Sequence, residues 1–437
     1  MNLERILTDH MRLLEFITNR SPSLRLGSSN SEVFEPLDRA TYIEAFFDLV
    51  FVFCLHGVVS IITNVESGEA DWYSYYTFCF TFALMLQIWF NSVIFMNRFG
   101  TGRVPDIVFL TTNMFLLLVM TQAISTSWEN YLIYNICWVL IIINTIVHWS
   151  LRFLLIENPS PTIRRDTRMS IITLSIQAAL VLLSHLMPST PAQIVCLVAV
   201  LIGFAFWQTG GKDNPEERNH EHLAERCALL MVLTFGETLV TFGDEMFATM
   251  DLFIPILYFL LVVGMFLVYL NQIMNLVNLD RLGGGRSYMV LTGWLVFCIA
   301  NATASFKMSS LSITLMGMSG YVYFSISVMV FLLSMFFFMP FTEYKQPKAK
   351  WMVARVIACL LVLLQIPALD LSPTFLIKNT SWSRETIAMV YILMSYSMTV
   401  IAVASVYAVL IIDRIAIRRE RRNAANAESV DTTEVST

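Results

Sequence analysis

Two carboxylates stand in a stretch of the chain where charged side chains are costly. Glu44 and Asp48 lie four residues apart within residues 41–63, TYIEAFFDLVFVFCLHGVVSIIT, which is otherwise strongly hydrophobic. Residues four apart share one face of a helix, so both side chains point the same way. A carboxylate at the centre of a bilayer costs about 2.5–3.5 kcal/mol or more and marks a functional site by default. We therefore expect Asp48 either to bind a cation or proton, or to pair with a buried base or amide.

A histidine and two further carboxylates extend this set. His56 lies eight residues beyond Asp48, which is about 12 Å along a helix. Glu225 and Glu237 lie in a second apolar stretch and are separated by about 18 Å on the same helical rise. We predict that Asp48, Glu237 and His56 bind a cation or proton, and that Glu44 and Glu225 form the cytoplasmic mouth of its path.

Structural explanations compete with these roles. Glu44 fits a capping box with Thr41, in which the Glu44 carboxylate accepts a hydrogen bond from the backbone N–H of Thr41. Glu225, with Arg226 and His222, fits a charge cluster at the membrane surface. His56 is a lone histidine among apolar residues, and a hydrogen bond to a backbone carbonyl would satisfy it. The sequence leaves both explanations open for each residue.

Metal and enzyme chemistry have little support. The sequence HEHLAE, residues 220–225, lacks the spacing of a zinc site, and the seven cysteines form no metal-binding pattern. We therefore expect no metal and no cofactor. The sequence contains no nucleophile elbow, phosphate-binding loop or kinase signature, and we expect no enzyme.

The elements that position these residues are membrane helices. The chain has 437 residues, of which 56% are hydrophobic and 14% charged, whereas soluble domains carry roughly 25% charged residues. We predict an all-α integral membrane protein with about twelve transmembrane helices, because an isolated strand in lipid would leave its backbone unpaired. The predicted spans are residues 42–63, 74–96, 106–125, 131–155, 169–187, 192–209, 223–243, 252–278, 288–306, 317–341, 351–369 and 386–412.

The basic residues orient these spans. If the N-terminus is cytoplasmic, every lysine and arginine except Lys307, Lys378 and Arg384 lies on the inside, as the positive-inside rule requires. We therefore predict a multi-pass protein with both termini in the cytoplasm. The predicted end segments are residues 1–38, cytoplasmic with a candidate amphipathic helix over 1–17, and residues 414–437, basic and then disordered. Asn379 begins an outside acceptor sequence for glycosylation.

Two similar loops indicate an internal duplication. RFGTGR, residues 98–103, and RLGGGR, residues 281–286, share the frame R-x-G-x-G-R at an offset of 183 residues. Asn91 and Asn275 lie near equivalent positions beside these loops, and we predict that they contribute to the cytoplasmic mouth. The predicted repeats are residues 39–210 and 211–413. They would be parallel six-helix units related by an axis along the membrane normal.

The polar residues follow nearly the same offset. At 181 residues, Glu44 falls on Glu225 and His56 falls on Glu237, while Asp48 falls on a leucine. We therefore expect the first and seventh spans to lie beside the repeat axis, with His56 and Glu237 at matching depths. Asp48 is the residue that breaks the symmetry.

The same stretches resemble a known family. EAFFDLVFVF, residues 44–53, and HLAERCALLMVLTFGET, residues 222–238, are similar to the two signature motifs of the bacterial low temperature requirement protein A family, E-x-F-F-D-L-V-F-V and E-R…G-E. By topology the resemblance covers residues 36 to 412. Ala45 replaces the usual leucine, and Thr238 stands where serine is common. The resemblance implies a fold and a link to growth in the cold, and it implies no particular substrate.

These observations favour a transporter or channel for a small cation, with proton coupling as one form of the mechanism. The expected partners are that cation or proton and the lipid bilayer, with no nucleic acid. The alternative is a non-transporting scaffold or stress-adaptation protein whose carboxylates are structural pairs. A third hypothesis, an enzyme acting on lipid, would require His56, Glu237 and another polar group to converge in a water-filled cavity. The oligomeric state and the identity of the membrane stay open.

Overall fold

The computed structural model gives the arrangement of most of the chain. It describes residues 41–65, 67–102, 104–124, 131–156, 159–209, 219–249, 253–275, 277, 285–311, 313–341, 356–357, 360 and 384–434. The segment 1–38 and the sequon at Asn379 lie outside the described residues.

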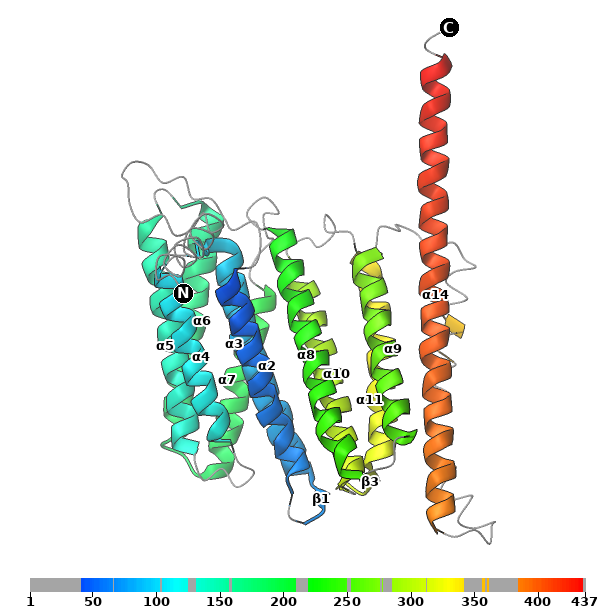
Figure 1. Cartoon of the computed structure of the whole chain (residues 1–437). Helices are drawn as coiled ribbons and strands as arrows, with labels where there is room; N and C mark the ends of the chain where they lie inside the picture. The colour runs from blue at the N-terminus through cyan, green and yellow to red at the C-terminus, as the bar shows by residue number, and fades with distance from the viewer. Residues whose placement is uncertain are drawn as a thin grey trace, which may run out of the picture.

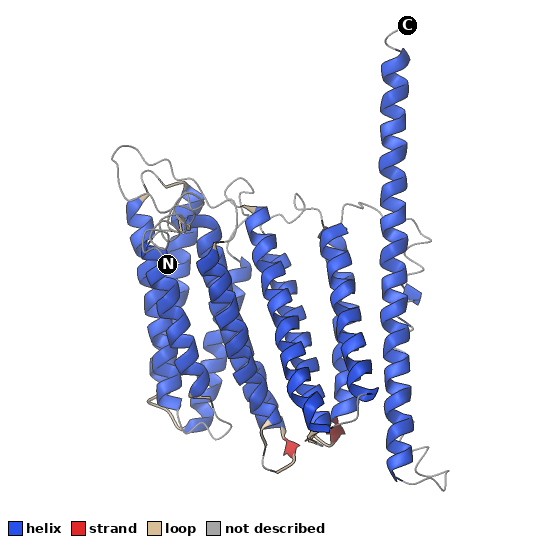
Figure 2. Ribbon diagram, viewed as in Figure 1, coloured by secondary structure: helices blue, strands red, loops and turns tan. Residues whose placement is uncertain are grey.

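The described part of the chain is almost entirely helical (Figures 1 and 2). The helices are α2 (Tyr42–Thr63), α3 (Trp72–Phe99), α4 (Val104–Gln122), α5 (Tyr131–Leu155), α6 (Pro161–Ser184), α7 (Ser189–Thr209), α8 (His220–Thr249), α9 (Phe253–Asn275), α10 (Arg286–Ser310), α11 (Gly320–Ser334), the 3-10 helix η4 (Met335–Phe341) and α14 (Arg384–Glu434). Seven described helices contain segments long and apolar enough to cross a membrane: residues 42–63, 72–99, 104–122, 131–155, 161–184, 286–308 and 399–423. Shorter apolar helices cover residues 191–204, 259–273 and 322–334. The chain is a multi-pass membrane protein.

The helix positions follow the hydropathy of the sequence closely. Predicted spans 42–63 and 131–155 have the bounds of α2 and α5. Each other predicted span also falls on a helix, except 351–369, most of which lies outside the described residues. The agreement has a simple cause, because a helix is the element that satisfies every backbone group of a spanning segment from within.

A small sheet departs from the all-α prediction. The strands β1 (Glu69–Ala70), β2 (Thr314–Leu315) and β3 (Met318–Ser319) pair in that order, β1 parallel to β2 and β2 antiparallel to β3. Met316 and Gly317 form the turn between β2 and β3, both with positive φ, 51° and 77°, as a two-residue hairpin turn requires. The sheet joins the α2–α3 loop to the α10–α11 loop. Two-residue strands from distant loops leave no pattern that a sequence can reveal.

The C-terminal segment also differs from its prediction. We predicted a disordered tail over residues 414–437, but α14 continues as one helix to Glu434 and extends beyond the other helices in Figure 1. The local sequence accounts for the difference, because RRERRNAANAE is composed mainly of arginine, alanine and glutamate, which are strong helix formers.

Helix α2 is the central element of the region that carries the candidate site. It packs against α3, α4, α8 and α10. Phe47, Phe51 and Cys54 point inward and are fully buried. Gly57 allows close contact with α4, because a Cβ at this position would lie 2.3 Å from the Thr121 methyl group. α2 and α8 run side by side in the same direction (Figure 1).

Candidate functional site

A buried arginine joins α2 to α8 near the ends at which both helices begin. Arg226 of α8 donates from Nη1 to Oε1 of Glu44 at 2.6 Å. Its Nε and Nη2 donate to the two oxygens of Asp48 at 2.9 and 2.6 Å. All three side chains have no exposed surface. A two-point contact between guanidinium and carboxylate fixes geometry as well as charge, so Arg226 holds both acidic residues in place.

The remaining carboxylate oxygens are also occupied. The indole Nε1 of Trp89, on α3, donates to Oδ1 of Asp48 at 2.6 Å. Oε2 of Glu44 accepts from the backbone N–H and the hydroxyl of Thr41, both at 2.8 Å. The predicted return bond of a capping box is therefore present. Glu44 thus caps α2 and binds the arginine of α8 at the same time.

His222 completes this group, and its neighbours define its tautomer. Asn97 Nδ2 donates to the carbonyl of Asn219 at 2.7 Å, which identifies that atom as the amide nitrogen, since a carbonyl oxygen only accepts. The same Nδ2 lies 3.2 Å from Nδ1 of His222, so Nδ1 accepts and the ring proton is on Nε2. Nε2 lies 3.2 Å from Oε2 of Glu44. We call Glu44, Asp48, Trp89, His222 and Arg226 the Arg226 cluster.

The cluster follows from two matching spacings on parallel helices. Glu44 and Asp48 are four residues apart on α2, and His222 and Arg226 are four apart on α8, so each pair lies on one helix face. The residues joined across the contact are 178 or 182 positions apart here and 181 apart further along α2 and α8. A nearly constant separation means that the two helices stay in register along their contact.

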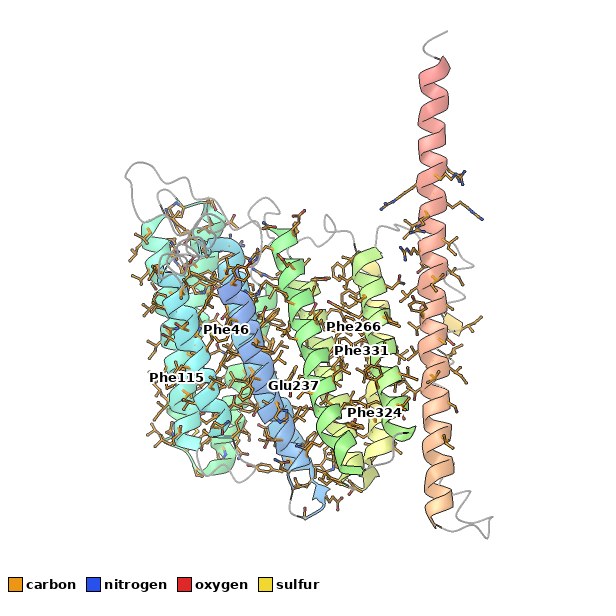
Figure 3. The ribbon with its side chains drawn as sticks, viewed as in Figure 1. Phe46, Phe115, Glu237, Phe266, Phe324 and Phe331 are labelled. Carbon is orange, nitrogen blue, oxygen red and sulfur yellow. The ribbon has the colours of Figure 1, made fainter. Side chains whose placement is uncertain are left out.

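A second polar contact lies further along the same two helices. Nδ1 of His56 and Oε1 of Glu237 are 2.5 Å apart. The side chain of His56 is 43% exposed and that of Glu237 is 20% exposed. Figure 3 labels Glu237 on α8 facing α2. The prediction that these residues lie at matching depths is confirmed by their contact.

The His56–Glu237 pair lines a small hollow in the protein surface. The lining residues are Leu55, His56, Val59, Thr234, Glu237, Ala300 and Thr303. The hydroxyls of Thr234 and Thr303 donate to carbonyls one turn earlier, at 2.7 and 2.9 Å, and the Thr303 hydroxyl also contacts that of Thr238 at 2.8 Å. The hollow thus places a carboxylate and an imidazole beside two threonine side chains, and it is about large enough for one water molecule.

The other predicted mouth residues are placed differently. Glu44 is buried in the Arg226 cluster, whereas Glu225 is exposed on α8, so the structure does not bring them together at one mouth. Asn91 is half-buried on α3 and makes no hydrogen bond to the described residues of either site. Asn275 ends α9, and its side chain lies outside the described part of the chain.

Three contributors were missed or misassigned at the level of sequence. Arg226 and His222 fitted a surface cluster, but both point inward and are fully buried. Trp89 gave no signal, because a tryptophan in an apolar span is ordinary. The i, i+4 match between EAFFD and HLAER could have revealed the first two, since EAFFD carries two acids four residues apart and HLAER carries two bases at the same spacing. Among the described residues, no three His, Cys, Asp or Glu side chains gather as metal ligands do.

Comparison with known proteins gives a family match over most of the chain. Residues 39–412 match the family described as Bacterial low temperature requirement A protein (LtrA). An uncharacterized protein of Rhizobium meliloti (strain 1021) is 24% identical over 229 residues, which cover 49% of this chain and 53% of that protein. The chain thus spans about half the length of this curated relative. No solved structure matches.

Proposed function

This chain belongs to the bacterial low temperature requirement A (LtrA) family, and we propose that it is a transporter or channel for a small cation, with a proton as either the ion or its coupled partner. The path runs along α2 and α8, and His56 and Glu237 form the binding site. The observation that carries the proposal is their 2.5 Å contact in a partly open hollow within two apolar helices.

The chemistry of the hollow favours a cation over an anion. Glu237 contributes carboxylate oxygens, which are the hard ligands that small cations prefer. His56 and Glu237 share one short hydrogen bond, so a proton can pass between them with little movement. An ionisable pair inside a membrane protein is expensive and marks ion and proton pathways in pumps and transporters.

Asp48 takes a different role in this proposal. Arg226 and Trp89 already donate to its oxygens and the side chain is fully buried, so an ion could bind only by displacing these donors. We propose that Asp48 and Glu44 clamp α2 to α8 while ions pass at the other pair. The parallel, in-register contact of α2 and α8 supports two parallel six-helix repeats. The distribution of lysine and arginine supports twelve spans with both termini cytoplasmic.

Flux measurements on reconstituted protein test the proposal. Purified protein is placed in liposomes, and potassium, sodium and proton flux is recorded for wild type, Glu237→Gln and His56→Gln. Glu221→Gln is the matched control, because it makes the same change on the same helix at an exposed position. We expect both site variants to lose most of the flux and the control to keep it. Equal flux in all variants, or none above empty liposomes, would refute the proposal.

The Arg226 cluster favours a second candidate, a non-transporting scaffold or stress-adaptation protein. Its carboxylates form a fully buried, charge-paired group of the kind that fixes how helices meet. In that case Asp48→Asn lowers thermal stability sharply and no variant gives an ion-dependent signal. Flux in wild type above that of empty liposomes would exclude this candidate.

A further inference from the structure

One stripe of α2 is open to the surroundings of the protein. Phe46, Leu49 and Phe53 are 51%, 49% and 57% exposed, at spacings of three and four residues that place them on one side of the helix. His56 continues the same stripe three residues later. The rest of this helix is largely buried against its neighbours. The stripe is therefore a single apolar face that ends in a polar group.

A matching stripe lies on α8. Val232 and Val240 are 45% and 58% exposed, and Gly236 between them is also exposed. A Cβ at Gly236 would meet no atom within 4 Å, so this part of α8 has open space beside its backbone. Glu237 follows immediately. The two stripes adjoin at the His56–Glu237 contact, and we call them together the α2–α8 face (Figure 3).

The polar pair on this face has unused hydrogen-bonding capacity. Apart from their mutual contact, neither His56 nor Glu237 makes a side-chain hydrogen bond to another described residue. Whichever of the two holds the shared proton, a ring nitrogen and a carboxyl oxygen remain unused. In hydrocarbon such groups would stay unsatisfied, which is strongly unfavourable. Lipid alone is thus a poor cover for this face.

We propose that a second copy of this chain covers the α2–α8 face through a two-fold axis along the membrane normal. A two-fold interface brings the same patch of both copies together. When Nε2 of His56 carries a proton, the pair offers that N–H as a donor and the second carboxyl oxygen of Glu237 as an acceptor. The pair is then complementary to itself, because the imidazole of each copy donates to the carboxyl group of the other. The small residue Gly236 allows the backbones to approach closely, as helices in membranes do.

This arrangement deepens the proposed function and rests on it for the role of the site. Two copies place four ionisable side chains around one axis, so the cation or proton path lies between the copies. The hydrogen-bonding argument itself requires no transport. The dimer and the flux can therefore be tested separately.

Cross-linking in membranes tests the interface. All seven native cysteines are replaced, and Phe53→Cys is introduced on the α2–α8 face. The matched control is Phe115→Cys on α4, which is 65% exposed outside that face. A short bismaleimide is added to native membranes, and the products are separated by size. We expect Phe53→Cys to give a cross-linked dimer and Phe115→Cys to stay monomeric. Equal cross-linking at both positions, or none at either, would overturn the proposal.

A second variant tests the same interface by a mass measurement, which does not depend on cross-linking. Gly236→Trp places an indole at a position where a Cβ would meet no atom within 4 Å. Leu140→Trp on α5, which is 44% exposed, is its control. Mass measurement in lipid nanodiscs should give a dimer for wild type and Leu140→Trp, and a monomer for Gly236→Trp. A wild-type monomer refutes the interface. A dimer without flux refutes the proposed function and leaves the interface intact.

Discussion

The two polar contacts between α2 and α8 differ in how completely the protein surrounds them. In the Arg226 cluster, Glu44, Asp48 and Arg226 have no exposed surface, and both carboxylates are bound by the guanidinium and further donors. In the second contact, the side chains of His56 and Glu237 are 43% and 20% exposed and, within the described part of the chain, hydrogen-bond only to each other. The same two helices thus carry one closed contact and one open contact.

This difference in enclosure separates charged groups that hold the helices together from charged groups that can exchange a proton or an ion. A closed ion pair with every oxygen bound cannot accept an ion without breaking several hydrogen bonds, and breaking such a pair is strongly destabilising. An open pair beside a hollow can exchange a proton or take up a cation with little rearrangement. Charged residues in one membrane helix can therefore have opposite roles, and the degree of enclosure distinguishes them.

Removal of the buried arginine should have the largest effect. Arg226→Met leaves two carboxylates buried without a base, and we expect it to lower the free energy of unfolding by about 3–5 kcal/mol. Thermal unfolding in detergent measures the change. Arg165→Met is the control, because Arg165 is half-exposed in its contact with Asp166 and should cost about 0–1 kcal/mol. Similar Tm values for the two variants would contradict the conclusion that the Arg226 cluster is a buried, fully paired contact.

Neutralising one carboxylate of the cluster should have an intermediate effect. Asp48→Asn keeps the shape but removes the charge that Arg226 binds at two points, and we expect a loss of about 1.5–3 kcal/mol. Its flux per folded molecule should stay close to that of wild type. Loss of flux with unchanged Tm would instead make Asp48 an ion ligand, as the sequence first suggested.

Removal of the indole donor should cost less. Trp89→Phe removes one hydrogen bond to Asp48 while Arg226 still binds both oxygens. We expect a loss of about 0.6–1.5 kcal/mol, measured by the same thermal assay. A double-mutant cycle with Asp48→Asn should show coupling between the two residues. Strict additivity of the two losses would show that the bond contributes nothing.

The open pair should give the smallest change in stability. Glu237→Gln replaces a partly exposed carboxylate that has one partner, and we expect a change of about 0–1 kcal/mol. The same variant should lose flux. A stability loss as large as that of Asp48→Asn would erase the distinction between the two contacts and favour the scaffold candidate.

A comparison of predicted and observed partners for individual residues shows what sequence patterns can predict. The offset of 181 residues predicted that His56 and Glu237 lie at one depth, and they are in contact. The same offset gave Asp48 a leucine as counterpart, which hid its partner Arg226 three positions earlier on α8. Conserved spacing along two parallel helices predicts depth well. The spacing does not predict which neighbour a long side chain contacts, because the side chain of an arginine can reach a residue almost one helical turn away.

Hydropathy and residue type are enough to predict a multi-pass helical membrane protein, the positions of most of its helices and the polar residues that matter. Long apolar runs specify membrane helices because lipid offers no partner to an unpaired backbone, and charged residues stand out in them because each is costly there. The enclosure of Asp48 and the exposure of Glu237 became visible once the helices were placed in space. Enclosure depends on side chains from α3, α8 and α10 that meet α2 in space, and that meeting is a property of packing, which no local pattern records.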